Sequence, residues 1–160
     1  MIYCSWEYNP TEKILLRHVT IDAIVLDKKR SKILLVKRSL KVSNPGKWAL
    51  PGGYLDRDEN TSEGALRELK EETGHEGKMI SLFRVNDNPN RPQEDTQNVD
   101  FVYLVEAQDK TGKPDNESSE IKWFDLENFP EKKDFAFDHY ENIMLYLKYR
   151  ETQSPLPIFN

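Results

Sequence analysis

The sequence predicts a single domain of mixed strands and helices, and three observations support this. Alternating apolar residues over 19–25 and an apolar run over 33–36 predict two strands joined by a polar turn. Helical periodicity with clear signals at both ends predicts a helix over 60–73. The 160 residues suit one compact domain, without an internal repeat or a charge block that would mark a second. We expect residues 1–13 to form an N-terminal extension and 151–160 a C-terminal tail.

The central helix is predicted from its ends as well as from its period. Asn60 suits the N-cap position, and Glu63 three residues later can complete a capping box. Leu66 and Leu69 then recur at helical spacing. Gly74 suits the left-handed position that follows a helix, because glycine lacks the Cβ that strains other residues there. These signals agree on one helix.

Beyond the central helix, the pattern predicts three more strands and one more helix. The expected strands cover 79–85, 98–107 and 121–125, and a polar loop over 86–97 is long enough to suggest a functional role. The last helix is expected to start near Asp138, capped by that residue, with Glu141 as the capping-box partner. Its buried face should hold Tyr140, Ile143, Met144 and Leu147.

Bulk properties exclude several classes of protein. The chain is 37% hydrophobic and 32% charged, which is typical of a globular protein, and its net charge of -5 does not favour nucleic-acid binding. We find neither a signal peptide nor an apolar run long enough to span a bilayer, so we expect a cytoplasmic protein that does not bind membranes. The lone Cys4 allows no internal disulfide, and the histidines lack metal-ligand spacing for zinc.

Three glutamates of the central helix carry the chemistry. Glu68, Glu71 and Glu72 stand at i, i+3 and i+4, so they share one helix face and repel one another. Two interpretations follow from this spacing. A solvated acidic face is the commoner meaning of such glutamates, whereas a hard divalent cation would offset the repulsion. The glycine turn over 48–53 that leads into the helix favours the metal site.

The segment Gly53–His75 resembles the Nudix box. It has a glycine, five residues, Glu59, seven residues, and then the run Arg-Glu-Leu-Lys-Glu-Glu-Thr-Gly over 67–74. One position departs from the family pattern, because His75 stands where an aliphatic residue is usual, and we expect this to affect packing more than catalysis. The similarity extends over about 18–147. The chain is therefore identified as a candidate Nudix hydrolase.

The resemblance implies both a fold and a reaction. The fold is the α+β Nudix fold, an α/β/α sandwich with a central mixed sheet. The reaction is cleavage of the diphosphate linkage of a nucleoside-diphosphate derivative by metal-activated water, with Mg²⁺ as the expected cofactor and Mn²⁺ as a possible one. The enzyme would be a divalent-metal-dependent pyrophosphohydrolase.

The resemblance also assigns roles within the box. The implied metal ligands are Glu68, Glu71, Glu72 and the carbonyl of Gly52, with Glu68 a possible catalytic base. Arg67, which we also count as catalytic, resembles the partner of Glu59 in a salt bridge that orients the helix. Gly53 and Gly74 are expected to be structural.

Outside the box, two acidic residues and one basic residue are candidates. Glu120 is our first choice for a loop-borne base, because it stands next to the expected strand at 121–125. Glu117 is the second choice and a candidate substrate contact. Arg38 follows an expected strand at a place where related enzymes often contact a phosphate. The alternative for all three is an ordinary surface charge.

Substrate choice is less constrained. Pro89, Pro92 and the segment 136–139 resemble features of ADP-ribose pyrophosphatases, which favours ADP-ribose or a related nucleotide sugar, although Asp138 and His139 could simply cap a helix. The alternatives are a pyrophosphohydrolase of oxidised or non-standard nucleoside triphosphates and, more distantly, a non-catalytic ADP-ribose sensor. The expected partner is a small nucleotide substrate. A homodimer that involves residues 1–13 is possible.

Overall fold

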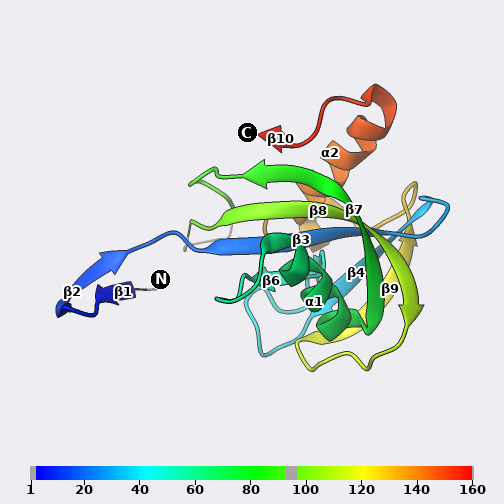
Figure 1. The fold of residues 1–160 in the computed structure, drawn as a ribbon. Helices are drawn as coiled ribbons and strands as arrows, with labels where there is room; N and C mark the ends of the chain where they lie inside the picture. The colour runs from blue at the N-terminus through cyan, green and yellow to red at the C-terminus, as the bar shows by residue number, and fades with distance from the viewer. Residues whose placement is uncertain (1–2, 93–96, 160) are drawn as a thin grey trace.

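The computed structural model describes residues 3–92 and 97–159, and Figure 1 shows a twisted sheet with a helix on each face. Within these ranges the sheet has eight strands in the order β10-β7-β8-β3-β4-β5, with β6 paired to β3 and β9 paired to β4. The strands are β3 (Val19–Leu26), β4 (Lys32–Arg38), β5 (Trp48–Ala49), β6 (Gly52–Tyr54), β7 (His75–Asn86), β8 (Val99–Lys110), β9 (Ser118–Asp125) and β10 (Ile158–Phe159).

The sheet is mixed, as the resemblance implies. The pairs β3–β8 and β10–β7 are parallel, and the other pairs are antiparallel. On the side of β3 that faces away from β8, β4 pairs with β3 only at Val25 and Leu26. β6 pairs with the other end of β3 on the same side. Pro51 lies between the two pairings, where its carbonyl accepts the N–H of Ala23 at 2.9 Å. The glycine turn is thereby built into the middle of the sheet.

Two helices cover the sheet, and each face has its own core. α1 (Thr61–Thr73) packs on one face, where Ala23 and Val25 point towards Leu69. α2 (His139–Thr152) packs on the other face, where Ile24 and Leu26 of β3 belong to the same buried cluster as Ile143. Burial of each such aliphatic side chain contributes about 1.5–3 kcal/mol, so the period-two pattern of β3 fixes both layers. A short 3-10 helix, η1 (Lys132–Asp134), precedes α2.

The central helix forms as predicted. The Asn60 side chain accepts N–H groups at the start of α1, and Glu63 bonds back to the Asn60 N–H, which completes the capping box. Gly74 follows the helix in the left-handed region with φ of 77°. Because this turn leads directly into β7, the strand begins at His75 rather than at the expected residue 79.

Several other boundaries differ from the prediction. β8 continues to Lys110 and β9 begins at Ser118, three residues before the expected start, because both strands pair with neighbours beyond their apolar segments. In α2, Met144 is 43% exposed, whereas Asn142 and Tyr146 are buried instead. The expected C-terminal tail contributes β10, which pairs with the end of β7.

The expected N-terminal extension is a separate hairpin of β1 (Tyr3–Trp6) and β2 (Asn9–Leu15). Figure 1 shows this hairpin standing away from the body of the molecule, joined to β3 by a short linker. No helix in the described part of the chain is long and apolar enough to cross a membrane.

Candidate active site

The helix α1 contacts the glycine turn through two of its glutamates. Glu72 is only 5% exposed, and its Oε2 accepts the N–H of Gly52 at 3.0 Å. The Glu68 carboxylate lies so close to Gly53 that a Cβ on that glycine would stand 2.5 Å from Oε1. Only glycine permits this approach without a shift. The two box glutamates therefore face the turn that opens the site.

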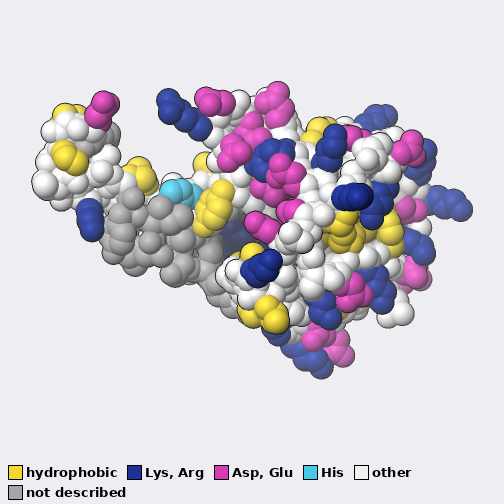
Figure 2. All heavy atoms as spheres, turned by 90° about the horizontal axis from the view of Figure 1, so that it is seen from below, with side chains coloured by type: hydrophobic (Ala, Val, Ile, Leu, Met, Phe, Trp, Pro, Cys, Tyr) yellow, Lys and Arg dark blue, Asp and Glu magenta, His cyan; other side chains and the backbone are white. Residues whose placement is uncertain are grey.

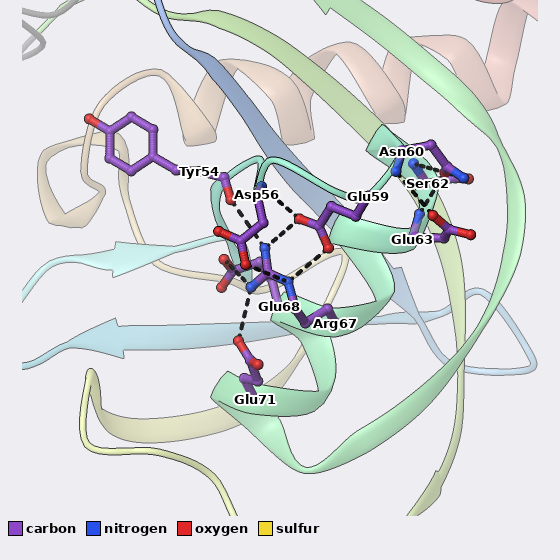
Figure 3. Close-up of polar contacts among 9 residues, drawn as sticks. All are labelled: Tyr54, Asp56, Glu59, Asn60, Ser62, Glu63, Arg67, Glu68 and Glu71. Carbon is purple, nitrogen blue, oxygen red and sulfur yellow. Dashed lines mark hydrogen bonds and ion pairs between the residues drawn. The ribbon is translucent and has the colours of Figure 1, made fainter. Parts of the chain in front are cut away.

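Arg67 holds the carboxylates around it, as Figure 3 shows. Its guanidinium donates to both oxygens of Glu59, with Nε–Oε2 at 2.9 Å and Nη2–Oε1 at 2.7 Å. Nη1 donates to Glu68 Oε1 at 2.8 Å and to Glu71 Oε2 at 2.9 Å, and Nη2 donates to the carbonyl of Tyr54 at 3.1 Å. A planar, permanently charged fork can make all these bonds at once. Arg67 thus orients the face of the helix that carries these glutamates.

The site concentrates negative charge. Burial raises the pKa of Glu68, although the nearby Arg67 acts to lower it, and the charges of Glu71 and Glu117 raise it further. Burial also raises the pKa of Glu72 well above its usual range, and the charges of Glu68 and Asp115 add to the shift. Figure 2 shows Asp and Glu side chains gathered around Lys and Arg side chains on the face seen from below. Such a donor set suits a hard divalent cation.

The geometry of the carboxylates meets this chemistry in part. Glu68 and Glu72 lie at the glycine turn, but Glu71 is bonded to Arg67 and its side chain is 51% exposed. Within residues 3–92 and 97–159, no three acidic, cysteine or histidine side chains are close enough together to surround an ion as they stand. The residues fit a divalent cation by the kind of donor that they supply.

A cleft of about 530 Å³ opens beside the glycine turn. Gly52 and Gly53 line it, together with the predicted candidates Arg38 and Glu117. Glu120 is not among the lining residues. It lies within β9 opposite Lys37, and its Oε2 is 3.6 Å from the Nζ of that lysine. The structure differs from the expectation in the boundary of this strand, because Glu120 lies inside β9, which begins at Ser118, rather than in the loop before it.

Arg38 stands at the wall of the cleft. Its Nε donates to the carbonyl of Ser43 at 2.6 Å, and its Nη2 donates to the Ser43 hydroxyl at 3.0 Å. The guanidinium also lies over the ring of Phe137, 5.2 Å from the centroid. These contacts fix a cation beside the space where an anionic substrate would bind.

The floor of the cleft is a buried ionic network that the sequence analysis missed. Arg91 donates to Asp138 through Nη2 at 2.7 Å, and the same nitrogen lies 3.6 Å from Asp100 Oδ2. Asp138 occupies the N-cap position of α2 as expected, but its side chain bonds to Arg91 and makes no cap bond. The expected capping box with Glu141 does not form, and Glu141 pairs with Lys132 instead. Charged residues inside apolar strands, such as Asp22 and Asp100, were the available signal, because unpaired charges are rarely buried.

His139 joins this network as a neutral ring. Its Nδ1 accepts the N–H of Leu50 at 2.8 Å, so the proton resides on Nε2, which faces Asp22 Oδ2 at 3.4 Å. Burial lowers the pKa of His139 to about 4, and burial raises the pKa of Asp22 to about 7. Asp22, Arg91 and His139 all line the cleft. The floor thus presents polar groups to whatever the cleft binds.

Comparisons with known proteins agree with this site. A family model described as the NUDIX domain matches residues 16–146. An ADP-ribose pyrophosphatase of Methanocaldococcus jannaschii is 35% identical over 134 residues, which cover 82% of this chain and 74% of that protein. Nudix hydrolase 6 of Arabidopsis thaliana is 31% identical over 69% of this chain, which spans 40% of that protein.

A solved structure shows the same fold. The crystal structure of a NUDIX hydrolase from Nitrosomonas europaea superposes with a TM-score of 0.76 at 25% identity, covering 92% of this chain and 80% of that one. Residues 16–146, which the family model matches, include the box helix, the glycine turn and the strands that form the cleft. This chain therefore belongs to the NUDIX family, whose members hydrolyse pyrophosphate bonds with the help of divalent metal ions.

Proposed function

We propose that this hydrolase cleaves the diphosphate linkage of ADP-ribose or a related nucleotide sugar. The observation that carries the proposal is the cleft of about 530 Å³, which is lined by the glycine turn and by Arg38. The carboxylates of Glu68 and Glu72 lie against this turn. This volume lies within the roughly 300–1,000 Å³ usual for sites that enclose small molecules. The name of the Methanocaldococcus jannaschii relative, ADP-ribose pyrophosphatase, supports the substrate class.

Within this proposal, each residue of the site has a separate role. Glu68, Glu71, Glu72 and the carbonyl of Gly52 would hold a divalent cation, Mg²⁺ or alternatively Mn²⁺. Bound there, the cation would neutralise the charge of the diphosphate and activate water. Arg67 keeps the carboxylates in place, and Arg38 donates to a phosphate oxygen.

Glu117 is the loop-borne base in this proposal, in place of Glu120. Two observations support the change: Glu117 lines the cleft, and its charge is close enough to raise the pKa of Glu68. Its loop is tied to the end of the neighbouring strand β4, because the Glu117 carbonyl accepts the N–H of Ser39 at 2.8 Å. Glu68 itself is the alternative base.

The test of the proposed function is a substrate panel. Purified protein is incubated with ADP-ribose, other nucleotide sugars and nucleoside triphosphates, each with Mg²⁺, Mn²⁺ or excess chelator, and products are separated by chromatography. We expect AMP and ribose 5-phosphate from ADP-ribose, and no turnover with chelator. Release of pyrophosphate from nucleoside triphosphates at far higher efficiency would assign the enzyme to the triphosphate pyrophosphohydrolases instead.

We also propose that the N-terminal hairpin pairs with a second copy of the chain. A lone two-stranded hairpin is marginally stable in water, and this one carries exposed apolar side chains, with Tyr8 81% exposed and Leu15 also exposed. Light scattering coupled to gel filtration should give twice the monomer mass. The double variant Tyr8→Glu with Leu15→Lys should run as a monomer. A cytoplasmic location stays a prediction for cell fractionation.

A further inference from the structure

Phe137 has an unusual backbone conformation beside the cleft. Its φ is 51°, in the left-handed region that bulky side chains rarely adopt. The neighbouring residues hold it there: the buried Ala136 donates its N–H to the Trp48 carbonyl at 2.9 Å, and the buried Asp138 is bonded to Arg91. With both sides anchored, the left-handed turn directs the phenyl ring to the cleft, which it lines. Strain of this kind often marks a binding site.

The surroundings of the ring differ from those of a packing residue. Phe135, two residues earlier, is buried in the core, whereas Phe137 is half-buried. Among the described residues, Phe137 is not one of the hydrophobic side chains that pack against either core cluster. It instead lies 5.2 Å from the guanidinium of Arg38 and 5.4 Å from the ring of His139, and both of these residues also line the cleft.

We propose that Phe137 is the nucleobase-binding residue of this hydrolase. Its ring stacks on the base of a nucleoside-diphosphate derivative, while the diphosphate lies towards the glycine turn at Gly52 and Gly53. The proposal deepens the proposed function and rests on it for the class of substrate. An aromatic ring can stack on any base, and Arg38 fixes the orientation of this ring through the cation–π contact.

The test compares two ligands that differ in the base. The dissociation constants of AMP and of ribose 5-phosphate are measured by calorimetry for the wild type and for Phe137→Leu, which keeps apolar bulk but removes the ring. We expect AMP to bind about tenfold or more weakly to the variant, and ribose 5-phosphate to bind equally well to both proteins. Phe137→Tyr should restore AMP binding. This measurement needs no turnover, so it can succeed even if ADP-ribose is not the substrate.

A second variant separates binding from packing. Phe137→Gly removes the ring and also relieves the left-handed strain, so we expect an unchanged or higher melting temperature together with weaker AMP binding. The matched control is Phe135→Leu, which should lower the melting temperature while leaving the ratio of AMP to ribose 5-phosphate affinity unchanged. Three results would overturn the proposal: unaltered AMP affinity in both Phe137 variants, an equal loss for both ligands, or no binding of AMP to the wild type.

Discussion

Replacement of Glu72 by glutamine should separate the stability of the protein from its activity. In the structure, the Glu72 carboxylate is buried and accepts the N–H of Gly52 at 3.0 Å. The amide oxygen of glutamine can accept the same bond. The neutral side chain also removes the repulsion with Glu68, and burial of an amide costs less than burial of a charge. We therefore expect Glu72→Gln to melt at or above the temperature of the wild type when no metal is present.

With the metal present, we expect the wild type to melt at a higher temperature than Glu72→Gln. A cation present at about 100 times its dissociation constant stabilises the folded state by about 2.7 kcal/mol. In a chain of 160 residues, each kcal/mol raises the melting temperature by roughly 2–4 °C, so the wild type should gain roughly 5–11 °C. Glu72→Gln lacks one charged ligand and should lose most of this gain. Its turnover should fall by at least about 10²-fold.

The assay is thermal unfolding of both proteins with chelator and with saturating Mg²⁺, alongside turnover of the best substrate of the panel. Glu76→Gln is the matched control, because Glu76 is a half-exposed glutamate that contacts Lys70 and Thr111 outside the cleft. The control should behave as the wild type in every measurement. Near-normal turnover of Glu72→Gln, or a marked loss of its stability without metal, would refute the reasoning.

Three further predictions follow from the contacts of the site. Arg67→Lys should lower turnover and reduce the free energy of unfolding by about 1–3 kcal/mol, because lysine cannot bond both oxygens of Glu59 at once, and denaturant titration would measure the loss. Glu117→Gln should cost about 10² to 10⁴ in turnover and Glu120→Gln only a few-fold, so the reverse order would return the role to Glu120. The pKa of Asp22 is raised from 3.8 to about 7, so its protonated form stabilises the fold fully below pH 3.8, and this stability is lost as the pH rises through about 7. The melting temperature of the metal-free protein, measured from about pH 4 to pH 7, should show this loss of stability. In Asp22→Asn, the melting temperature should depend less on pH over the same range.

The box and its helix could be predicted because their determinants are local. The capping residues of α1, its apolar stripe and its left-handed end all lie within 15 residues of sequence, and each acts on the backbone next to it. The spacing of Glu68 and Glu72 likewise places both side chains on one face whatever surrounds the helix. Their contact with the glycine turn depends on the sheet, but the turn is joined to the helix by a short loop, which leaves few other arrangements.

The ranking of Glu117 and Glu120 could not be settled by local pattern. The apolar alternation marks β9 only from residue 121, yet the strand starts at Ser118 because β4 supplies pairing partners as far as Arg38. Glu120 therefore lies inside β9, and Glu117 is the last residue before it. The partner strand, absent from the local sequence, therefore decides that Glu120 is a strand residue, whereas Glu117 stands just before the strand and lines the cleft.

The cleft floor could not be predicted for a related reason, which also bears on its role. An aspartate inside an apolar strand, such as Asp22 or Asp100, would alone favour a solvated face, because a buried charge without a partner is costly. In the structure both are buried, and the compensating groups come from elsewhere in the chain: Arg91 from the loop after β7 and His139 from the start of α2. Three segments must meet before any of these groups is stable. The floor is therefore complete only in the folded protein, which holds its polar groups in place before a substrate enters.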